Sequence, residues 1–177
     1  GCNCVVNIDY PLSCAVKVLI CPDKFKGSLD AQGVCHAIAK GVLELYPTAE
    51  IDALPLADGG EGTCSLLTEW SGGKIVSKQV HGPLFEHVTA SYGISGDGKT
   101  AFVEMAEASG LMLLRPEQRN PLLTTTFGTG ELIADALDRG VQTIILGTGG
   151  SATNHGGIGM ASALGVDFID AFGESLK

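Results

Sequence analysis

The segment VQTIILGTGGSATNHGG, residues 141–157, decides the fold. It begins with a short apolar run, Val141–Leu146, which is typical of a buried strand in a parallel sheet, and continues as a glycine-rich loop over 147–157. Small and apolar residues over 158–164 then predict a helix that ends at Gly165. A strand, a glycine-rich loop and a helix in this order predict a βαβ unit of an α/β protein.

The N-terminal part of the chain shows the same alternation of strand and helix. The run KVLIC at 17–21 predicts a buried strand, and IDALPL at 51–56 predicts the next one. Between them, apolar residues recur every three or four positions, as on one face of a helix: Val34, Ile38, Val42 and Leu45. Ser28 or Asp30 is suited to cap the start of this helix, and Pro47 marks its end.

The middle of the chain has a different pattern. Three alternating runs, KIVSKQV, HVTASYGI and TAFVEM, lie between 74 and 105 and predict antiparallel strands. The predicted fold class is therefore α/β, with Rossmann- or flavodoxin-like βαβ units and an antiparallel β insert. Near the C-terminus, Val166–Ile169 is expected to form a strand that runs into a turn. The predicted segments are an extension (1–15), an α/β segment (16–74), the insert (75–118) and a second α/β segment (119–177).

The overall composition excludes several classes of protein. Twenty acidic residues against 11 basic ones give a net charge of -9, which disfavours binding to nucleic acid and to anionic membrane surfaces. No apolar run approaches the roughly 18 residues needed to span a bilayer. The six cysteines do not follow the pattern of a disulfide framework, and Cys2, Cys4 and Cys14 lack the spacing of a metal cluster. We therefore expect a cytoplasmic protein with reduced thiols.

The glycine-rich loop is a candidate anion site. Backbone N–H groups at the junction of a strand and a helix bind phosphate or carboxylate groups. The candidate residues for contacts to a cofactor phosphate are Gly149, Gly150, Ser151, Thr153 and Asn154. A tight turn for close helix packing is the structural alternative. The loop also fits the dinucleotide fingerprint G-x-G-x-x-A, with Asp167 about 20 residues beyond its first glycine, so a nicotinamide-dependent hydroxy-acid oxidoreductase is the second hypothesis.

Residues 93–100, GISGDGKT, match the Walker A pattern of nucleotide-binding P-loops. A P-loop opens a helix, whereas the residues that follow here, AFVE, continue a strand pattern. An Asp-Gly pair at 97–98 is typical of a hairpin turn. We therefore predict that Lys99 lies at the solvated tip of a hairpin and that this segment is not a P-loop.

Two loops that follow predicted parallel strands carry charged and hydroxyl side chains. The first contains Asp23, Lys26 and Ser28, of which the lysine and the hydroxyl suit contact with a carboxylate or a phosphate. The second contains Asp58 and Glu61, which suit a metal ion or the acceptance of a proton. Helix capping and ordinary surface exposure are the structural alternatives.

Further candidates lie between 119 and 130. Arg119 offers a planar guanidinium to a carboxylate. The stretch Thr124–Gly130, with Thr126 and Gly128, combines hydroxyl groups with the start of a helix and is a second candidate anion cradle. A β-branched run that leads into a capped helix is the structural alternative.

Five motifs together carry a resemblance to a known family. They are PDKFKGS at 22–28, DGGEGT at 58–63, EMAEASGL at 104–111, RNPLLTTTFGTGEL at 119–132 and ILGTGGSATNHGG at 145–157. In this order they resemble the bacterial type 1 glycerate kinase family, over about residues 16–177. The resemblance implies a two-domain α/β enzyme with its active site in the cleft between the domains, of which this chain resembles the N-terminal half.

The resemblance further implies ATP with Mg²⁺ as co-substrate and D-glycerate as the phosphoryl acceptor. The hypothesis is direct transfer, in which Lys26 and Ser28 hold the glycerate carboxylate. Asp58 orients the hydroxyl group and is the candidate ligand of Mg²⁺. Asp23, Glu61 and Arg119 complete the candidate substrate site, and the ATP phosphates bind the 151–154 loop.

Two features of the chain bear on its activity. The family usually has Asp after the asparagine of the last motif, where this chain has His155. In addition, half a cleft forfeits most of the positioning on which phosphoryl transfer depends. We therefore expect the chain by itself to be inactive and to self-associate through exposed apolar surface.

Overall fold

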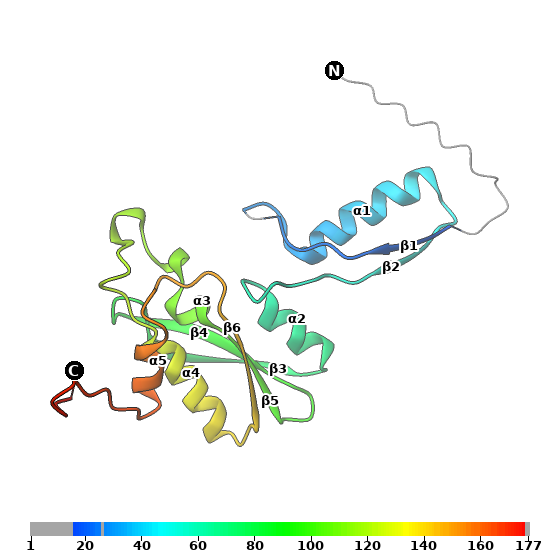
Figure 1. Cartoon of the computed structure of the whole chain (residues 1–177). Helices are drawn as coiled ribbons and strands as arrows, with labels where there is room; N and C mark the ends of the chain where they lie inside the picture. The colour runs from blue at the N-terminus through cyan, green and yellow to red at the C-terminus, as the bar shows by residue number, and fades with distance from the viewer. Residues whose placement is uncertain (1–15, 26, 176–177) are drawn as a thin grey trace. The chain divides into compact units, whose positions relative to one another are not determined.

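The structure, a computed structural model, describes residues 16–25 and 27–175 (Figure 1). The chain divides into two compact units, unit 1 at Gly1–Leu56 and unit 2 at Ala57–Lys177. The N-terminal extension with its three cysteines, and Lys26, lie outside the described residues. Within the described residues, no helix is long and apolar enough to cross a bilayer.

Unit 1 is a single βαβ element. Strands β1 (Lys17–Ile20) and β2 (Glu50–Ala53) pair in parallel, and helix α1 (Ala31–Leu45) connects them. Asp30 caps α1, because its carboxylate accepts the N–H group of Gly33 at 2.7 Å. The βαβ unit predicted from the sequence is therefore confirmed.

The apolar stripe of α1 is buried only near its N-terminal end. Val34 is 3% exposed, whereas Ile38 is 42% and Leu45 78% exposed. The periodicity predicted a continuous inward face, and within unit 1 that prediction is wrong for the C-terminal half of the helix. The physical reason is that a two-stranded sheet is too narrow to cover the whole face of a helix of this length.

Unit 2 is built on one mixed sheet in the order β3-β4-β5-β6. Its strands are β3 (Lys74–His81), β4 (His87–Ile94), β5 (Thr100–Glu104) and β6 (Thr143–Gly147). The first three are antiparallel neighbours, as predicted, and β5 pairs with β6 in parallel. The antiparallel insert and the following βαβ unit therefore share a single sheet.

Unit 2 has four helices among the described residues, of which α5 lies where the sequence predicts a helix over 158–164. They are α2 (Thr63–Trp70), α3 (Met105–Ser109), α4 (Phe127–Asp138) and α5 (Ile158–Ala163), with short 3₁₀ turns η1 (Leu111–Leu113) and η2 (Pro116–Gln118). The strand predicted at Val166–Ile169 is wrong, because this segment forms only an isolated bridge between Ile169 and Ser175. An apolar segment forms a strand only where a neighbouring strand hydrogen-bonds to it along its length. None of the described strands pairs with Val166–Ile169.

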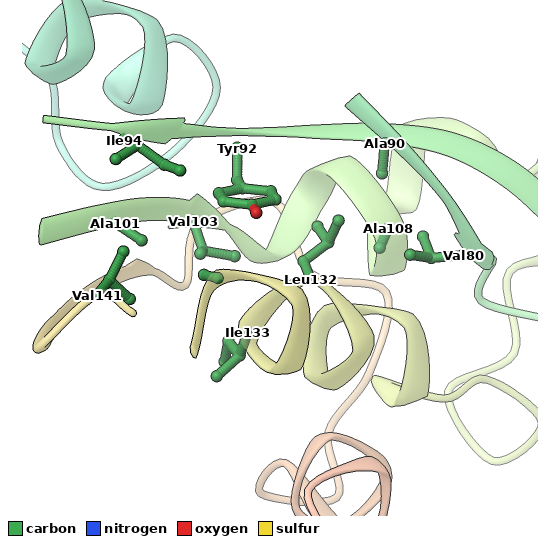
Figure 2. Packing of buried hydrophobic residues seen from close by; sticks show 11 residues of the cluster. Val80, Ala90, Tyr92, Ile94, Ala101, Val103, Ala108, Leu132, Ile133 and Val141 are labelled. Atoms are coloured by element: carbon green, nitrogen blue, oxygen red, sulfur yellow. The ribbon is translucent and has the colours of Figure 1, made fainter. Parts of the chain in front are cut away.

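The core of unit 2 lies between the sheet and α4. Figure 2 shows Tyr92, Val103 and Leu132 among the side chains that meet between the strands and this helix. Leu132, Ile133 and Ala136 of α4 are buried, as the helical spacing predicts. Leu137 of the same helix is 49% exposed.

Asp135 ties α4 to the sheet through three polar contacts. Its carboxylate accepts the Tyr92 hydroxyl at 2.6 Å, the Lys78 ammonium at 3.0 Å and the Arg139 guanidinium at 2.8 Å. Burial alone raises the pKa of Asp135, but these hydrogen bonds outweigh it and lower the pKa to about 2. The ionised form of Asp135 therefore stabilises the packing of α4 on β3 and β4.

This pKa predicts acid sensitivity. The folded pKa of Asp135 lies below the unfolded value of about 3.9, so its stabilisation is present above about pH 4 and is lost as the pH falls towards 2. We expect Asp135→Asn to lower the free energy of unfolding at pH 7 by about 1–2 kcal/mol and to flatten its dependence on pH between 4 and 2. Urea unfolding across this pH range measures both effects. Asp138→Asn, on the exposed side of α4, is the control, and an unchanged pH profile in Asp135→Asn would contradict the assignment.

A second prediction concerns the contact between α4 and β3. A Cβ atom added at Gly128 would collide with the main-chain carbonyl of His81, which cannot rotate away. We expect Gly128→Ala to destabilise the protein by about 1–3 kcal/mol, as overpacking in a core does. Gly41→Ala on α1 is the matched control, since nothing lies within 4 Å of its added Cβ and alanine favours a helix. Equal urea midpoints for the two variants would show that Gly128 is not held against β3.

Candidate functional site

The candidate site lies in unit 2, at the carboxyl ends of β5 and β6. Glu104 and Gly147 are register partners at these ends. Two loops meet there, the acidic loop at 57–62, which leads into α2, and the glycine-rich loop at 147–157, which leads into α5. Ligands of parallel α/β sheets bind at this edge, so the topology places the candidate residues where a ligand site is expected.

The two loops contact each other through their backbones. The Gly149 N–H group donates to the Gly59 carbonyl at 3.0 Å. A Cβ atom on Gly147 would lie 2.5 Å from the Gly59 carbonyl oxygen, and one on Gly149 would lie 2.6 Å from the Gly60 Cα atom. Only glycine allows this approach without displacement of one loop, which gives a specific reason for the glycines that the sequence shows.

Glu104 holds the N-terminal end of α2 through a hydrogen bond. This carboxylate is 4% exposed and accepts the N–H group of Cys64, in the first turn of α2, at 2.6 Å. A buried acceptor at a helix N-terminus satisfies a donor that has no partner within the helix and also interacts favourably with the helix dipole. Thr63 continues the restraint, because its hydroxyl donates to the Gly60 carbonyl at 2.7 Å and accepts the Gly59 N–H group at 3.1 Å.

Sequence reasoning assigned no role to Glu104, although it lies within one of the family motifs. The sequence does carry a signal for such a role, because an acidic residue ends the apolar run TAFVE at 100–104. A carboxylate buried at the end of a strand requires a hydrogen-bond partner. The neighbouring thiol is not a nucleophile, because burial raises the pKa of Cys64 to about 11. Glu104 therefore acts on the acidic loop by holding the helix that follows it.

Asp58 is exposed at the start of the acidic loop. One of its carboxylate oxygens accepts the Gly60 N–H group at 2.9 Å, which closes a tight turn. Glu61 is exposed in the same loop. The described residues contain no group of three or more side chains arranged to enclose a metal ion. Mg²⁺ bound to a nucleotide needs only one or two carboxylates, the remaining ligands being phosphate and water, and Asp58 fits that mode.

The first half of the glycine-rich loop is fixed by its neighbours. The Leu111 N–H group donates to the Gly150 carbonyl, and the Ala152 N–H group donates to the Ser109 carbonyl, each at 2.9 Å. The hydroxyls of Ser151 and Thr153 lie 2.9 Å apart. These contacts join the loop to the end of α3, so its shape is set before a ligand binds.

The second half of this loop carries unused donors. Among the residues that the structure describes, the backbone N–H groups of 154–157 make no hydrogen bond. Gly156 and Gly157 have φ values of +68° and +85°, which glycine adopts without strain. The Nδ1 atom of half-buried His155 is inaccessible to solvent and has no partner in the described structure. A run of unpaired N–H groups is the usual form of a backbone anion site.

Thr126 and Gly128 have packing contacts in the structure. Thr126 is fully buried, and its hydroxyl accepts the N–H group of Met160 in α5 at 2.8 Å. Thr124 is also buried and donates to the Ala152 carbonyl at 2.8 Å. These hydroxyls thus hold the glycine-rich loop and α5 in place, and a cofactor contact through the Thr126 hydroxyl would require this fully buried side chain to become accessible.

The remaining sequence candidates belong to other segments of the chain. Arg119 is exposed, and its guanidinium donates to the Leu114 carbonyl at 3.3 Å within its own segment. Asp23 and Ser28 belong to unit 1, where the Asp23 carboxylate accepts the Lys24 N–H group at 2.7 Å. Their part in a substrate site, like that of Lys26, remains a prediction.

The rejection of a P-loop at 93–100 is supported by the observed secondary structure. Residues 95–99 form the turn between β4 and β5, and no helix follows. The Lys99 N–H group donates to the Asp97 carboxylate at 3.0 Å, which closes this turn, and Lys99 is exposed. The hairpin prediction is confirmed.

The fold and the site define the chain as an α/β protein in which a glycine-rich loop is bonded to an acidic loop at the carboxyl ends of two parallel strands. The sequence model described as the Glycerate kinase family matches residues 18–177. The chain belongs to the glycerate kinase family.

Relatives of known name agree with this assignment. The chain is 55% identical over 162 residues to a glycerate kinase of Bacillus cereus. This match covers 92% of the chain and 42% of that protein. It is 53% identical over 161 residues to the glycerate 2-kinase of Escherichia coli, a match that covers 91% of this chain and 42% of that protein. A crystal structure of a protein described as glycerate kinase 2 from Salmonella typhimurium LT2 matches with a TM-score of 0.75 at 54% identity, over 91% of this chain and 43% of that one. The chain thus spans about two fifths of the length of these relatives.

The loop contact gives a testable prediction that does not depend on activity. We expect Gly147→Ala to force the two loops apart, because its Cβ meets a main-chain carbonyl. Loss of a hydrogen bond worth about 1–1.5 kcal/mol should speed exchange of the Gly149 amide hydrogen by about tenfold. Thr148→Ala, at an exposed neighbour, is the control. Unchanged protection of Gly149 in Gly147→Ala would show that the loops are not in contact.

Proposed function

We propose that this chain supplies the nucleotide-binding and acceptor-activating loops of a glycerate kinase, which phosphorylates D-glycerate with ATP. The observation that carries the proposal is the backbone contact between the acidic loop and the glycine-rich loop at the carboxyl ends of β5 and β6. It joins the loop that carries Asp58 to the loop that carries the unpaired backbone donors. Family membership supports the same reaction, since the relatives are named glycerate kinases.

The chain's residues have distinct roles in this proposal. The N–H groups of the 150–154 loop that make no hydrogen bond within the described structure, with the Ser151 and Thr153 hydroxyls, bind phosphate oxygens of ATP. Asp58 accepts a hydrogen bond from the attacking hydroxyl of glycerate and orients it towards the terminal phosphate. Lys26 and Ser28 pair with the glycerate carboxylate. Glu104 acts as a positioning residue, because it fixes the helix that follows the acidic loop.

Mg²⁺ belongs to the same proposal. Asp58 would hold the ion from the protein side, and the ion would neutralise negative charge on the ATP phosphates. The hydrogen bond from the Gly60 N–H group to one Asp58 oxygen sets the direction of this carboxylate. Loss of the carboxylate should therefore affect both metal binding and turnover.

The oxidoreductase hypothesis receives no comparable support. In a dinucleotide fold the acidic residue ends a strand and contacts the ribose. Here Asp167 is exposed, lies in no strand, and its carboxylate accepts the Ser175 hydroxyl at 2.6 Å. Together with the family assignment, this favours the kinase.

The experiment uses a chimera, because the chain spans only part of its relatives. Residues 16–177 replace the matching segment of the Escherichia coli glycerate 2-kinase, which is 53% identical. We expect D-glycerate-dependent release of ADP from the chimera, and a fall in kcat of about 10²–10⁴ in its Asp58→Asn variant. Lys99→Ala is the control and should keep the KM for ATP.

Further outcomes test the remaining parts of the proposal. The 177-residue chain alone should show no turnover, and sedimentation should reveal association, since Met112 and Leu122 are 84% and 83% exposed. A folded chimera without glycerate-dependent ADP release, or with substrate-dependent reduction of NAD(P)⁺, would overturn the kinase assignment.

A further inference from the structure

A pocket of about 330 Å³ lies in unit 2, at the end of the sheet away from the candidate site. Its lining comes from the segment after α2, the turn between β4 and β5, and the end of α4: Gly72, Gly73, Lys74, Ile94, Ser95, Gly96, Gly98 and Arg139. Strand β5 begins beside this turn at Thr100 and ends at Glu104 in the candidate site, about 13 Å further along the strand. A ligand in the pocket therefore leaves the candidate site free.

The pocket wall includes glycines of the segment 93–100, which resembles a P-loop in sequence but forms a hairpin. Here two backbone segments approach each other closely. A Cβ atom on Gly96 would lie 2.5 Å from the Ser71 carbonyl oxygen, and one on Gly73 would collide with the Ile94 carbonyl. The Gly96 N–H group also donates to the Ser71 carbonyl at 3.1 Å. The shape of this wall is therefore set by the backbone.

The charged side chains that line the pocket are both basic. Lys74 is the register partner of Ile94, so these two side chains lie on the same face of the sheet. Within the described structure, the Lys74 ammonium makes no hydrogen bond or ion pair. The Arg139 Nε–H group donates to Asp135 at 2.8 Å, which leaves the terminal NH₂ groups of this guanidinium as donors.

Neighbouring carboxylates do not neutralise this positive charge. Asp135 bonds to Lys78 as well as to Arg139, so one negative charge is shared by two cations, and Lys74 adds a third positive charge. Asp97 lies in the same turn but is not among the lining residues. A helix C-terminus also stabilises a cation, which gives Arg139 a structural role but not Lys74, at the start of a strand. A local excess of positive charge in a chain of net charge -9 favours an anionic ligand.

The lining also limits the chemistry of that ligand. Ile94 is the only large apolar side chain among the eight lining residues, so the pocket offers little surface to the base of a nucleotide. An ammonium and a guanidinium together suit a dianionic phosphate group, and the volume leaves room for a short polar chain attached to it. We infer that this pocket binds a small phosphate monoester, whose phosphate oxygens accept hydrogen bonds from Lys74 and Arg139.

Amide NMR of the 177-residue chain, titrated at constant ionic strength, tests the inference. We expect glycerol 3-phosphate to shift the amide signals of Gly73 and Gly96 in a saturable manner. It should bind more tightly than inorganic phosphate, because the pocket is larger than a bare phosphate ion. Lys74→Gln should weaken binding by about tenfold, as loss of one charge-assisted contact does. Lys40→Gln is the matched control, since it removes the same charge from an exposed position on α1.

The same spectra contain the results that would overturn the inference. Shifts confined to Gly149 and Gly150 would place the ligand on the glycine-rich loop, so the inference would fail while the proposed function stands. Tighter binding of inorganic phosphate, or equal binding of malonate, would show that the pocket does not select a phosphate monoester. Equal affinity in Lys74→Gln and wild type would remove Lys74 from the site. If both places respond, Lys74→Gln should weaken only the response of Gly73 and Gly96. The wild-type titration locates the ligand even if this variant fails to fold.

Discussion

The approach of two backbones at the carboxyl end of the sheet is the constraint on which the rest of the site depends. The backbone of Gly59 and Gly60 lies so close to Gly147 and Gly149 that neither of the last two positions accepts a side chain without movement. The hydrogen bond between Gly149 and Gly59 joins two residues that are 90 positions apart in sequence. This contact limits the distance between the side chains of the acidic loop and a ligand bound to the glycine-rich loop.

Buried polar groups support this contact from both sides. On one side Glu104 holds the first turn of α2, so the acidic loop is fixed at the end that enters the helix. On the other side Thr124 and Thr126 bind Ala152 and Met160, which fixes the glycine-rich loop and the start of α5. Phosphoryl transfer depends mainly on positioning and charge stabilisation, so a site built for it needs loops that keep their shape. These hydroxyls and this carboxylate are buried and serve that purpose.

Much of the fold could be predicted from the sequence, because short apolar runs and glycine-rich turns report local structure directly. The βαβ units, the antiparallel strands and the rejection of the P-loop at 93–100 all followed from periodicity and turn chemistry. Val166–Ile169 was mispredicted because a strand requires a partner that local sequence does not reveal. The stripe on α1 was overestimated for a related reason, since burial depends on the width of the sheet beneath the helix.

The candidate site was predicted less completely than the fold. The sequence located Asp58 and the glycine-rich loop, but the bond between Gly59 and Gly149 and the buried role of Glu104 depend on tertiary contacts between distant residues. The central claim is that both loops face one bound nucleotide, and paramagnetic broadening by Mn²⁺–ADP in amide NMR spectra of the chain tests it most directly. The account predicts strong broadening at both Gly60 and Gly150, with the hairpin tip at 95–99 unaffected. Broadening at the hairpin tip, or at only one of the two loops, would contradict it.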